Sequence, residues 1–167
     1  LIEFSSYHSY DGSLDSKNTY KYDDKGNVIE SSSYNSDAGS LDSKKTYKYD
    51  DKENLTERNK YNSNGSVTYK TALEYDDKGN MTEINWYNSN GSLDSKKTYK
   101  YDDKGNMTEK NCYNSNGSLT NKMAYEYDDK GNVITKWYND DKKTYKYDDK
   151  GTLIQKRFFF EDYVTNR

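Results

Sequence analysis

The sequence predicts an all-β protein: an antiparallel β-hairpin meander of about 13 strands, arranged as a twisted or curled single sheet or an open shell. Three observations predict this fold. The phrase Tyr-Asp-Asp-Lys recurs six times with its tyrosines 27, 26, 26, 26 and 20 residues apart, and a related phrase, Tyr-Asn-Ser-Asn-Gly-Ser, lies midway between several copies. The β-branched, Tyr, Ser and Asn residues, with glycine at each turn, also oppose helix formation. The 26-residue period therefore divides into two sub-repeats of about 13 residues, each long enough for one strand and one turn.

Each sub-repeat carries the signature of a tight hairpin turn. In Tyr-Asp-Asp-Lys-Gly-Asn (an "Asp turn") and Tyr-Asn-Ser-Asn-Gly-Ser (an "Asn turn"), the first Asp or Asn can bond its own backbone, and the next two residues suit a type I turn. The glycine then takes the left-handed conformation of a G1 bulge. Glu53 stands where one such glycine is expected, and a shorter hairpin at Asn139-Asp140 explains the spacing of 20. The predicted turn glycines are Gly12, Gly26, Gly39, Gly65, Gly79, Gly91, Gly105, Gly117, Gly131 and Gly151.

The strands between the turns are predicted to pair a tyrosine with an aliphatic residue at each turn. The residue before such a turn, for example Tyr87, lies opposite the residue two past the glycine, here Leu93. Alternation along the next strand then places Leu93, Tyr99 and Tyr101 on one face and Lys96 on the other. We therefore expect a tyrosine-rich face and a charged face, with the tyrosine-rich face covered by curling of the sheet or by another chain.

Two segments are predicted along the chain. Residues 1–155 are tandem hairpin repeats cut from a longer array, because residues 1–7 overlay residues 28–34 without a gap and the chain thus opens within a period. Residues 156–167 leave the motif and become aromatic, which indicates a C-terminal cap or the start of another segment.

Composition argues against several classes of protein. The formal net charge is −3 with acids and lysines interleaved, so no nucleic-acid-binding patch is indicated. The sequence has no apolar run of about 18 residues, so no membrane span is predicted. With one cysteine, Cys112, and one histidine, His8, we expect no disulfide framework, zinc site, haem site or other cofactor.

Paired acids in the Asp turns, such as Asp102 and Asp103, could bind calcium, which favours clustered oxygen ligands. A calcium loop supplies acids at alternate positions and a closing Glu, whereas this pair is followed by Lys and the same turn forms with Asn-Ser-Asn, so hairpin capping is the better interpretation. Six equivalent acid pairs offer no distinguished pair for acid–base catalysis. We therefore predict no catalytic residue, and His8 is interpreted as a turn residue.

The phrase Tyr-x-Tyr-Asp-x-x-Gly-Asn, present at residues 20–27, 99–106 and 125–132, resembles the core of the YD repeats of bacterial Rhs proteins. The resemblance covers nearly the whole chain, with departures at Glu53, Leu73 and Thr152. It implies an extracellular or bacterial cell-surface location and strands that spiral into a large β-shell, as in bacterial toxin complexes. It also implies carbohydrate binding, which has been proposed for such repeats.

Two functions follow as hypotheses. The first is a non-enzymatic structural or adhesive module of a bacterial surface or secreted protein, whose partners are other copies or the remainder of the parent protein. The alternative is a carbohydrate-binding module, because aromatic rings flanked by Asn, Asp and Lys can stack on sugars and bond their hydroxyls. The candidate stacking residues are Tyr61, Tyr75, Trp86, Tyr87, Tyr99, Tyr101, Tyr113 and Tyr127.

Overall fold

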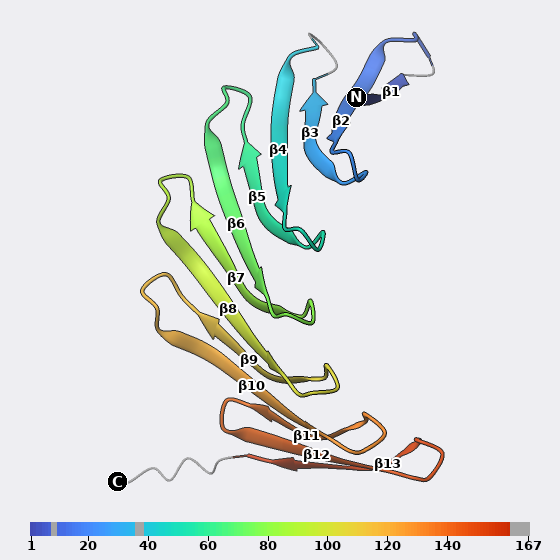
Figure 1. Ribbon diagram of the computed structural model, residues 1–167, viewed down its shortest axis with the longest axis vertical. Helices are drawn as coiled ribbons and strands as arrows, with labels where there is room; N and C mark the ends of the chain where they lie inside the picture. Colours follow the sequence, from blue (N-terminus) through green and yellow to red (C-terminus); the bar gives the residue numbers. More distant parts are fainter. Residues whose placement is uncertain (8–9, 36–38, 161–167) are drawn as a thin grey trace.

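The computed structural model describes residues 1–7, 10–35 and 39–160, which form one antiparallel β-sheet (Figure 1). Its 13 strands pair in the order of the sequence, so the predicted hairpin meander is confirmed. The strands are β1 (Ile2–Tyr7), β2 (Leu14–Tyr22), β3 (Val28–Tyr34), β4 (Leu41–Tyr49), β5 (Leu55–Tyr61), β6 (Val67–Tyr75), β7 (Met81–Asn88), β8 (Leu93–Tyr101), β9 (Met107–Tyr113), β10 (Leu119–Tyr127), β11 (Val133–Tyr138), β12 (Asp141–Tyr147) and β13 (Leu153–Phe159).

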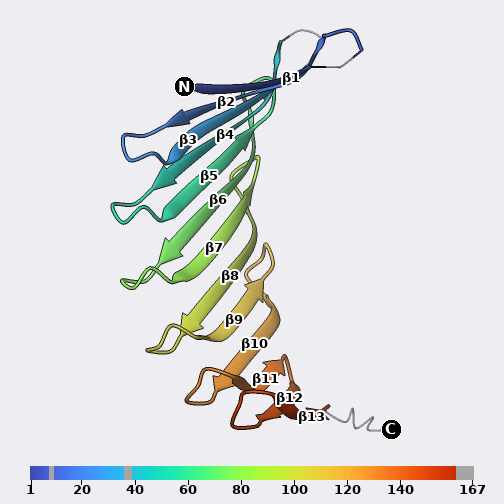
Figure 2. The same ribbon diagram turned by 90° about the vertical axis from the view of Figure 1, so that its right-hand side faces the viewer.

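The sheet is a single layer that twists and curves from β1 to β13. Figure 1 shows the curvature along the sheet. Figure 2 shows the strands fanning out between two rows of turns, one row at each end of the strands. Within the described ranges no hydrophobic side chain is buried, and the most buried residues are polar: Ser32, Thr71, Asn85 and Thr135, each at most 7% exposed. Curling therefore leaves most strand tyrosines half-buried instead of enclosing them. No helix in the described part of the chain is long and apolar enough to span a membrane.

The turns have the predicted geometry, as the Asp turn at 102–106 illustrates. The Asp102 N–H donates to the Asn106 carbonyl at 2.9 Å, and the Gly105 N–H donates to the Asp102 carbonyl at 3.0 Å. Gly105 has a φ of 85°, in the left-handed region that glycine adopts without steric cost. All ten glycines predicted at turns have positive φ, and Glu53 takes the same conformation with a φ of 67°. The shorter hairpin instead uses Asn139, at a φ of 52°.

The predicted pairing of tyrosine with an aliphatic residue is confirmed at each turn for which it was expected. Tyr87 lies opposite Leu93, and the same register joins Tyr22 to Val28, Tyr61 to Val67, Tyr75 to Met81, Tyr101 to Met107, Tyr113 to Leu119 and Tyr127 to Val133.

The predicted face of Leu93 was wrong because the strand contains a second bulge just after the turn. Trp86 pairs with Ser95, so Asp94 is an extra residue between the pairs 87–93 and 86–95. An extra residue reverses the alternation of faces. Leu93 therefore shares its face with Lys96 and Thr98, and Tyr99 lies on the other face.

The registers define two faces that extend through the whole sheet. The "tyrosine face" carries Tyr20, Tyr47, Tyr99, Tyr125 and Tyr145. The "glutamate face" carries all seven glutamates of the strands, together with the tyrosines that precede the Asn turns. These glutamates are Glu3, Glu30, Glu57, Glu74, Glu83, Glu109 and Glu126.

The C-terminal part of the chain continues the ladder beyond residue 155. Strand β13 ends at Phe159, which pairs with Lys142 of β12. Residues 161–167 and His8 lie outside the described residues, so the proposed division at residue 155 stays a prediction.

We expect the substitution Glu53→Gly to stabilise the protein by up to about 1 kcal/mol. A side chain in the left-handed conformation costs roughly 1–2 kcal/mol, and the larger entropy of glycine in the unfolded chain offsets part of that gain. Thermal and urea unfolding would measure the change. Glu53→Ala is the control, because it removes the side-chain contacts and keeps the strain; equal stability of the two variants would contradict the prediction.

Candidate functional site

In each Asp turn, the carboxylate of the first aspartate accepts hydrogen bonds from residues of the same turn. Asp102 Oδ1 accepts the N–H groups of Lys104 at 3.0 Å and Asn106 at 2.8 Å, and Oδ2 accepts the Asn106 side-chain amide at 2.9 Å. The hydrogen bond from the Asn106 side chain is the main cause that lowers the Asp102 pKa. The second acid, Asp103, is exposed and lies 3.8 Å from Lys78 Nζ. Among the described residues, no group of three or more His, Cys, Asp or Glu side chains is placed to hold a metal ion.

The lysine of each Asp turn reaches forward to the next Asp turn. Lys78 Nζ donates to the Asp103 carbonyl at 3.1 Å, and the same contact recurs along the row of Asp turns. This contact was not predicted, although lysine recurs at the third position after the tyrosine in all six Asp turns. The contacts are Lys25 to Asp51, Lys52 to Asp77, Lys78 to Asp103, Lys104 to Asp129 and Lys130 to Asp149, at 2.8 to 3.3 Å.

The tyrosine of each Asp turn reaches backward to the preceding one. The Tyr101 hydroxyl donates to the Met81 carbonyl at 2.8 Å, so the residue that pairs with Tyr75 also accepts the next tyrosine. Desolvation by burial raises the pKa of Tyr101. This series comprises Tyr49 to Val28, Tyr75 to Leu55, Tyr101 to Met81, Tyr127 to Met107 and Tyr147 to Val133, at 2.7 to 3.1 Å.

On the glutamate face, each central glutamate is held by lysines and an asparagine. Glu57 pairs with Lys48 at 2.8 Å and Lys70 at 2.5 Å, and it accepts the Asn59 amide at 3.0 Å. The hydrogen bonds from Lys48 and Lys70 are the largest causes that lower the Glu57 pKa from 4.5 to about 2. Equivalent networks surround Glu83, with Lys96 and Asn85, and Glu109, with Lys100, Lys122 and Asn111.

One position breaks this pattern. Glu74 lies directly opposite Glu83, where the equivalent pairs are Lys48 with Glu57 and Lys100 with Glu109. Like charges directly opposite each other on neighbouring strands are destabilising. Glu83 forms one ion pair, with Lys96 at 2.8 Å. The Glu74 carboxylate occupies the position that a second lysine has in the neighbouring repeats.

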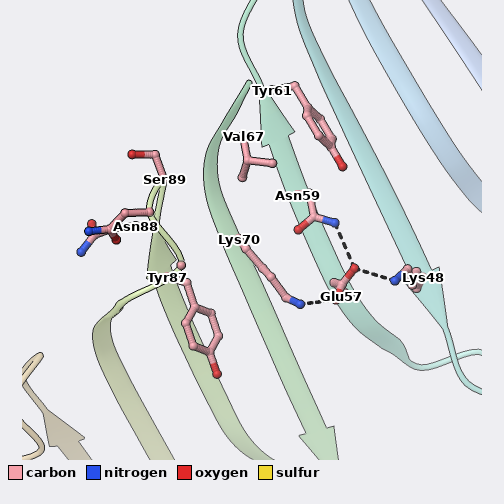
Figure 3. A pocket seen from close by; sticks show the side chains of 11 residues that line it. Lys48, Glu57, Asn59, Tyr61, Val67, Lys70, Tyr87, Asn88 and Ser89 are labelled. Atoms are coloured by element: carbon pink, nitrogen blue, oxygen red, sulfur yellow. Dashed lines mark hydrogen bonds and ion pairs between the residues drawn. The ribbon is translucent and has the colours of Figure 1, made fainter. Parts of the chain in front are cut away.

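An open groove of about 730 Å³ lies on the glutamate face between β4 and β7. Figure 3 shows Tyr61 of β5 and Tyr87 of β7 flanking Val67 and Lys70 of β6, with the Glu57 network at one end. The Asn turn at residues 88–91 forms part of its lining. The groove thus offers two half-buried aromatic rings beside amide, ammonium and carboxylate groups, a combination that suits a small polar ligand.

The eight candidate stacking aromatics do not form one row. All eight are half-buried, but only Tyr61, Tyr87 and Tyr113 lie on the glutamate face. Tyr75, Tyr101 and Tyr127 lie on the tyrosine face, and each donates its hydroxyl to a backbone carbonyl beside the preceding Asp turn. Tyr99 and Trp86 share that face, where Lys97 Nζ lies 4.9 Å from the Trp86 ring centroid. The structure brings together Tyr61 and Tyr87 in one groove and separates them from the other candidates.

A scan against protein-family models and a comparison with curated proteins give no match to this chain. Solved structures do show similarity. The Tc holotoxin pore of Photorhabdus luminescens is 17% identical to this chain with a TM-score of 0.41, and the match covers 84% of this chain and 9% of that one. The TcdB2-TccC3 crystal structure is 15% identical with a TM-score of 0.42, covering 92% of this chain and 10% of the other.

A porin-like protein from Bacteroides uniformis gives a similar score with a different extent of overlap. It is 10% identical with a TM-score of 0.43, and the match covers 94% of this chain and 92% of that chain. This chain spans about a tenth of the Tc toxin chains that it matches. The resemblance to YD repeats therefore rests on the sequence motif.

We expect Glu74→Lys to stabilise the protein by about 0.2–1 kcal/mol, because it replaces a repulsive cross-strand pair with the lysine–glutamate pair of the neighbouring repeats. Chemical unfolding at low ionic strength would measure the gain. Added salt should reduce the gain, since it screens both the repulsion and the new attraction. The reverse change, Lys48→Glu, is the matched control and should destabilise; two changes of the same sign would refute the explanation.

The lowered pKa of Glu57 predicts a loss of stability in acid. A carboxyl whose folded pKa lies below its unfolded pKa stabilises the protein above the unfolded value, and that stability disappears as pH falls from 4.5 towards 2. The loss should be on the order of 1–3 kcal/mol, after discounting for the exposed Lys48 partner. Unfolding curves of the natural chain and Glu57→Gln should converge across this interval, and a constant difference would count against the assignment.

Proposed function

We propose that the chain is a non-enzymatic structural module, a repeat scaffold of a bacterial surface or secreted protein. The observation that carries the proposal is the pair of contacts that joins each Asp turn to its neighbours, lysine forward and tyrosine backward. The YD-like motif supports the bacterial and extracellular assignment. Because the same tyrosine and lysine recur in the Asp turns, we infer that their role is attachment between repeats.

The energetics of the sheet suit a scaffold that extends by repetition. Each hairpin contacts only its neighbours, so stability is approximately a sum over repeats and the interfaces between them. Over the described residues, no closed apolar core limits the number of strands. The single layer can thus be lengthened or curved without repacking an interior, which is what a wall or spacer requires.

A second candidate, carbohydrate binding, is favoured by the groove between Tyr61 and Tyr87. Their rings flank an apolar side chain, Val67, and the Asn59 amide and Glu57 carboxylate supply groups that could bond sugar hydroxyls. The tyrosine hydroxyls that bond from one Asp turn to the preceding one belong to other residues. Tyr61 and Tyr87 could therefore contact a sugar without breaking these hydrogen bonds between repeats.

The scaffold proposal predicts that Tyr101→Phe lowers stability by about 0.5–1.5 kcal/mol, because it removes one hydroxyl donor and leaves the Met81 carbonyl without it. Tyr87→Phe is the matched control, since its hydroxyl takes no part in the contacts between turns and its loss should change little. Thermal unfolding and hydrogen–deuterium exchange of the backbone amides would measure both. Equal effects of the two substitutions would contradict the proposal.

Binding experiments on the same proteins separate the two functions. A scaffold should show amide protection throughout the strands that is unchanged by added oligosaccharides, and a glycan array should give no signal. Binding that disappears in Tyr61→Ala and Tyr87→Ala, and persists in Tyr101→Phe, would replace the scaffold proposal with the carbohydrate-binding one.

A further inference from the structure

Three of the Asn turns place an asparagine directly before the turn glycine. The pairs are Asn64-Gly65, Asn90-Gly91 and Asn116-Gly117, all exposed, whereas five Asp turns have lysine before the glycine. Asparagine followed by glycine is open to a reaction in which the glycine nitrogen attacks the side-chain amide, because glycine has no Cβ to block the approach. A Cβ added at Gly91 would meet no atom within 4 Å, so the surroundings are also open.

The structure distinguishes Asn90 from the other two asparagines. At Asn64 and Asn116, the side-chain Oδ1 accepts the backbone N–H of the serine two residues on, at 2.9 Å in both turns. At Asn90, Oδ1 accepts that N–H at 3.0 Å and also the Ser92 hydroxyl at 2.6 Å. Two donors on one amide oxygen draw electrons from Cγ and would stabilise the negative charge that develops on Oδ1 during attack.

The side chain of the first turn residue, an asparagine in all three turns, makes different hydrogen bonds in the turn at 88–92. In the turns at 62–66 and 114–118, Asn62 and Asn114 accept the serine N–H through Oδ1, so that this N–H is shared between two amide oxygens. In the turn at 88–92, the Asn88 amide instead donates to Ser92 Oγ at 3.4 Å. Ser92 Oγ is thereby held as an acceptor on one side and a donor to Asn90 on the other.

We propose that Asn90 is a site of spontaneous self-modification, with the Ser92 hydroxyl as a positioning group. The Gly91 nitrogen gives up its proton and its hydrogen bond to the Asn88 carbonyl, which is 2.9 Å long, and forms a bond to Asn90 Cγ. The Cγ–Nδ2 bond then breaks, and ammonia leaves with the proton that it gains. The result is a five-membered succinimide, and no oxidant or reductant is required.

Water then opens the succinimide at either carbonyl. One product is an aspartate in the normal backbone linkage, and the other is an isoaspartate linked through Cβ, which lengthens the turn by one backbone atom. An aspartate before a turn glycine makes the same two contacts elsewhere in the chain: Asp11 precedes Gly12, and its Oδ1 accepts the N–H and hydroxyl of Ser13 at 2.9 and 2.7 Å. Either product places a new negative charge at the groove that residues 88–91 line.

The chain contains its own comparison, because residues 87–93 and 113–119 have identical sequences, Tyr-Asn-Ser-Asn-Gly-Ser-Leu. Any difference in rate between Asn90 and Asn116 in the folded protein must come from their surroundings. The full chain would be incubated at neutral and mildly alkaline pH, and each site followed by peptide mass spectrometry, with isoaspartate scored by enzymatic methylation. The same incubation in concentrated urea gives the rates of the unfolded chain.

We expect Asn90 to react roughly 2- to 10-fold faster than Asn116 in the folded protein, the range that one hydroxyl hydrogen bond supplies. The two rates should be equal in urea. Ser92→Ala should bring the Asn90 rate down to that of Asn116, and Ser118→Ala should leave Asn116 unchanged. Equal rates in the folded chain, or a Ser92→Ala variant that keeps its folded circular dichroism and the faster rate at Asn90, would overturn the proposal.

Discussion

Both faces of the sheet are open to water, and this constraint determines how the rest of the structure is stabilised. A side chain on a single layer cannot be enclosed by a second layer, so hydrophobic burial is spread thinly over half-buried tyrosines and aliphatic residues. The remaining stability must come from hydrogen bonds and ion pairs with favourable geometry. The chain meets that need by repetition, because a contact that works between two turns works between all of them. The Asp carboxylate fixes the shape of one turn, and the lysine and tyrosine of that turn then find their acceptors in the next and the preceding turns.

The departures from the repeat show which contacts the fold requires. Between Tyr127 and Tyr147 the spacing falls to 20 residues, yet Lys130 still reaches the Asp149 carbonyl and Tyr147 still reaches the Val133 carbonyl. The chain shortens the hairpin at Asn139 and preserves both joints. Glu53 gives a second example: it is not glycine, yet it adopts the left-handed conformation, and its turn keeps the same backbone hydrogen bonds as the other Asp turns.

Local chemistry allowed much of this fold to be predicted from the sequence. Type I turns with a left-handed glycine have a short and specific signature, and they determined the number of strands and pairs such as Tyr87 with Leu93. The faces were harder to predict, because the extra residue at Asp94 has no sequence signature of its own and reverses the alternation. For the same reason the eight candidate aromatics could not be divided between faces. Contacts across a full period, such as Lys78 with Asp103, depend on the spacing of strands in space and required the structure.

The division of the tyrosines between two faces bears on how a scaffold could also acquire a ligand. Tyr75, Tyr101 and Tyr127 each lie opposite an aliphatic residue and donate the hydroxyl to a backbone carbonyl, so a ligand that used these hydroxyls would have to break a contact between repeats. Tyr61 and Tyr87 have the aliphatic partner but take no part in these joints. Substitution of Tyr61 or Tyr87 therefore leaves the contacts between Asp turns in place, and binding could evolve at these two rings while those contacts keep the repeats together. The groove is lined by an Asn turn and lies away from the row of Asp turns, with the Glu57 network at one end.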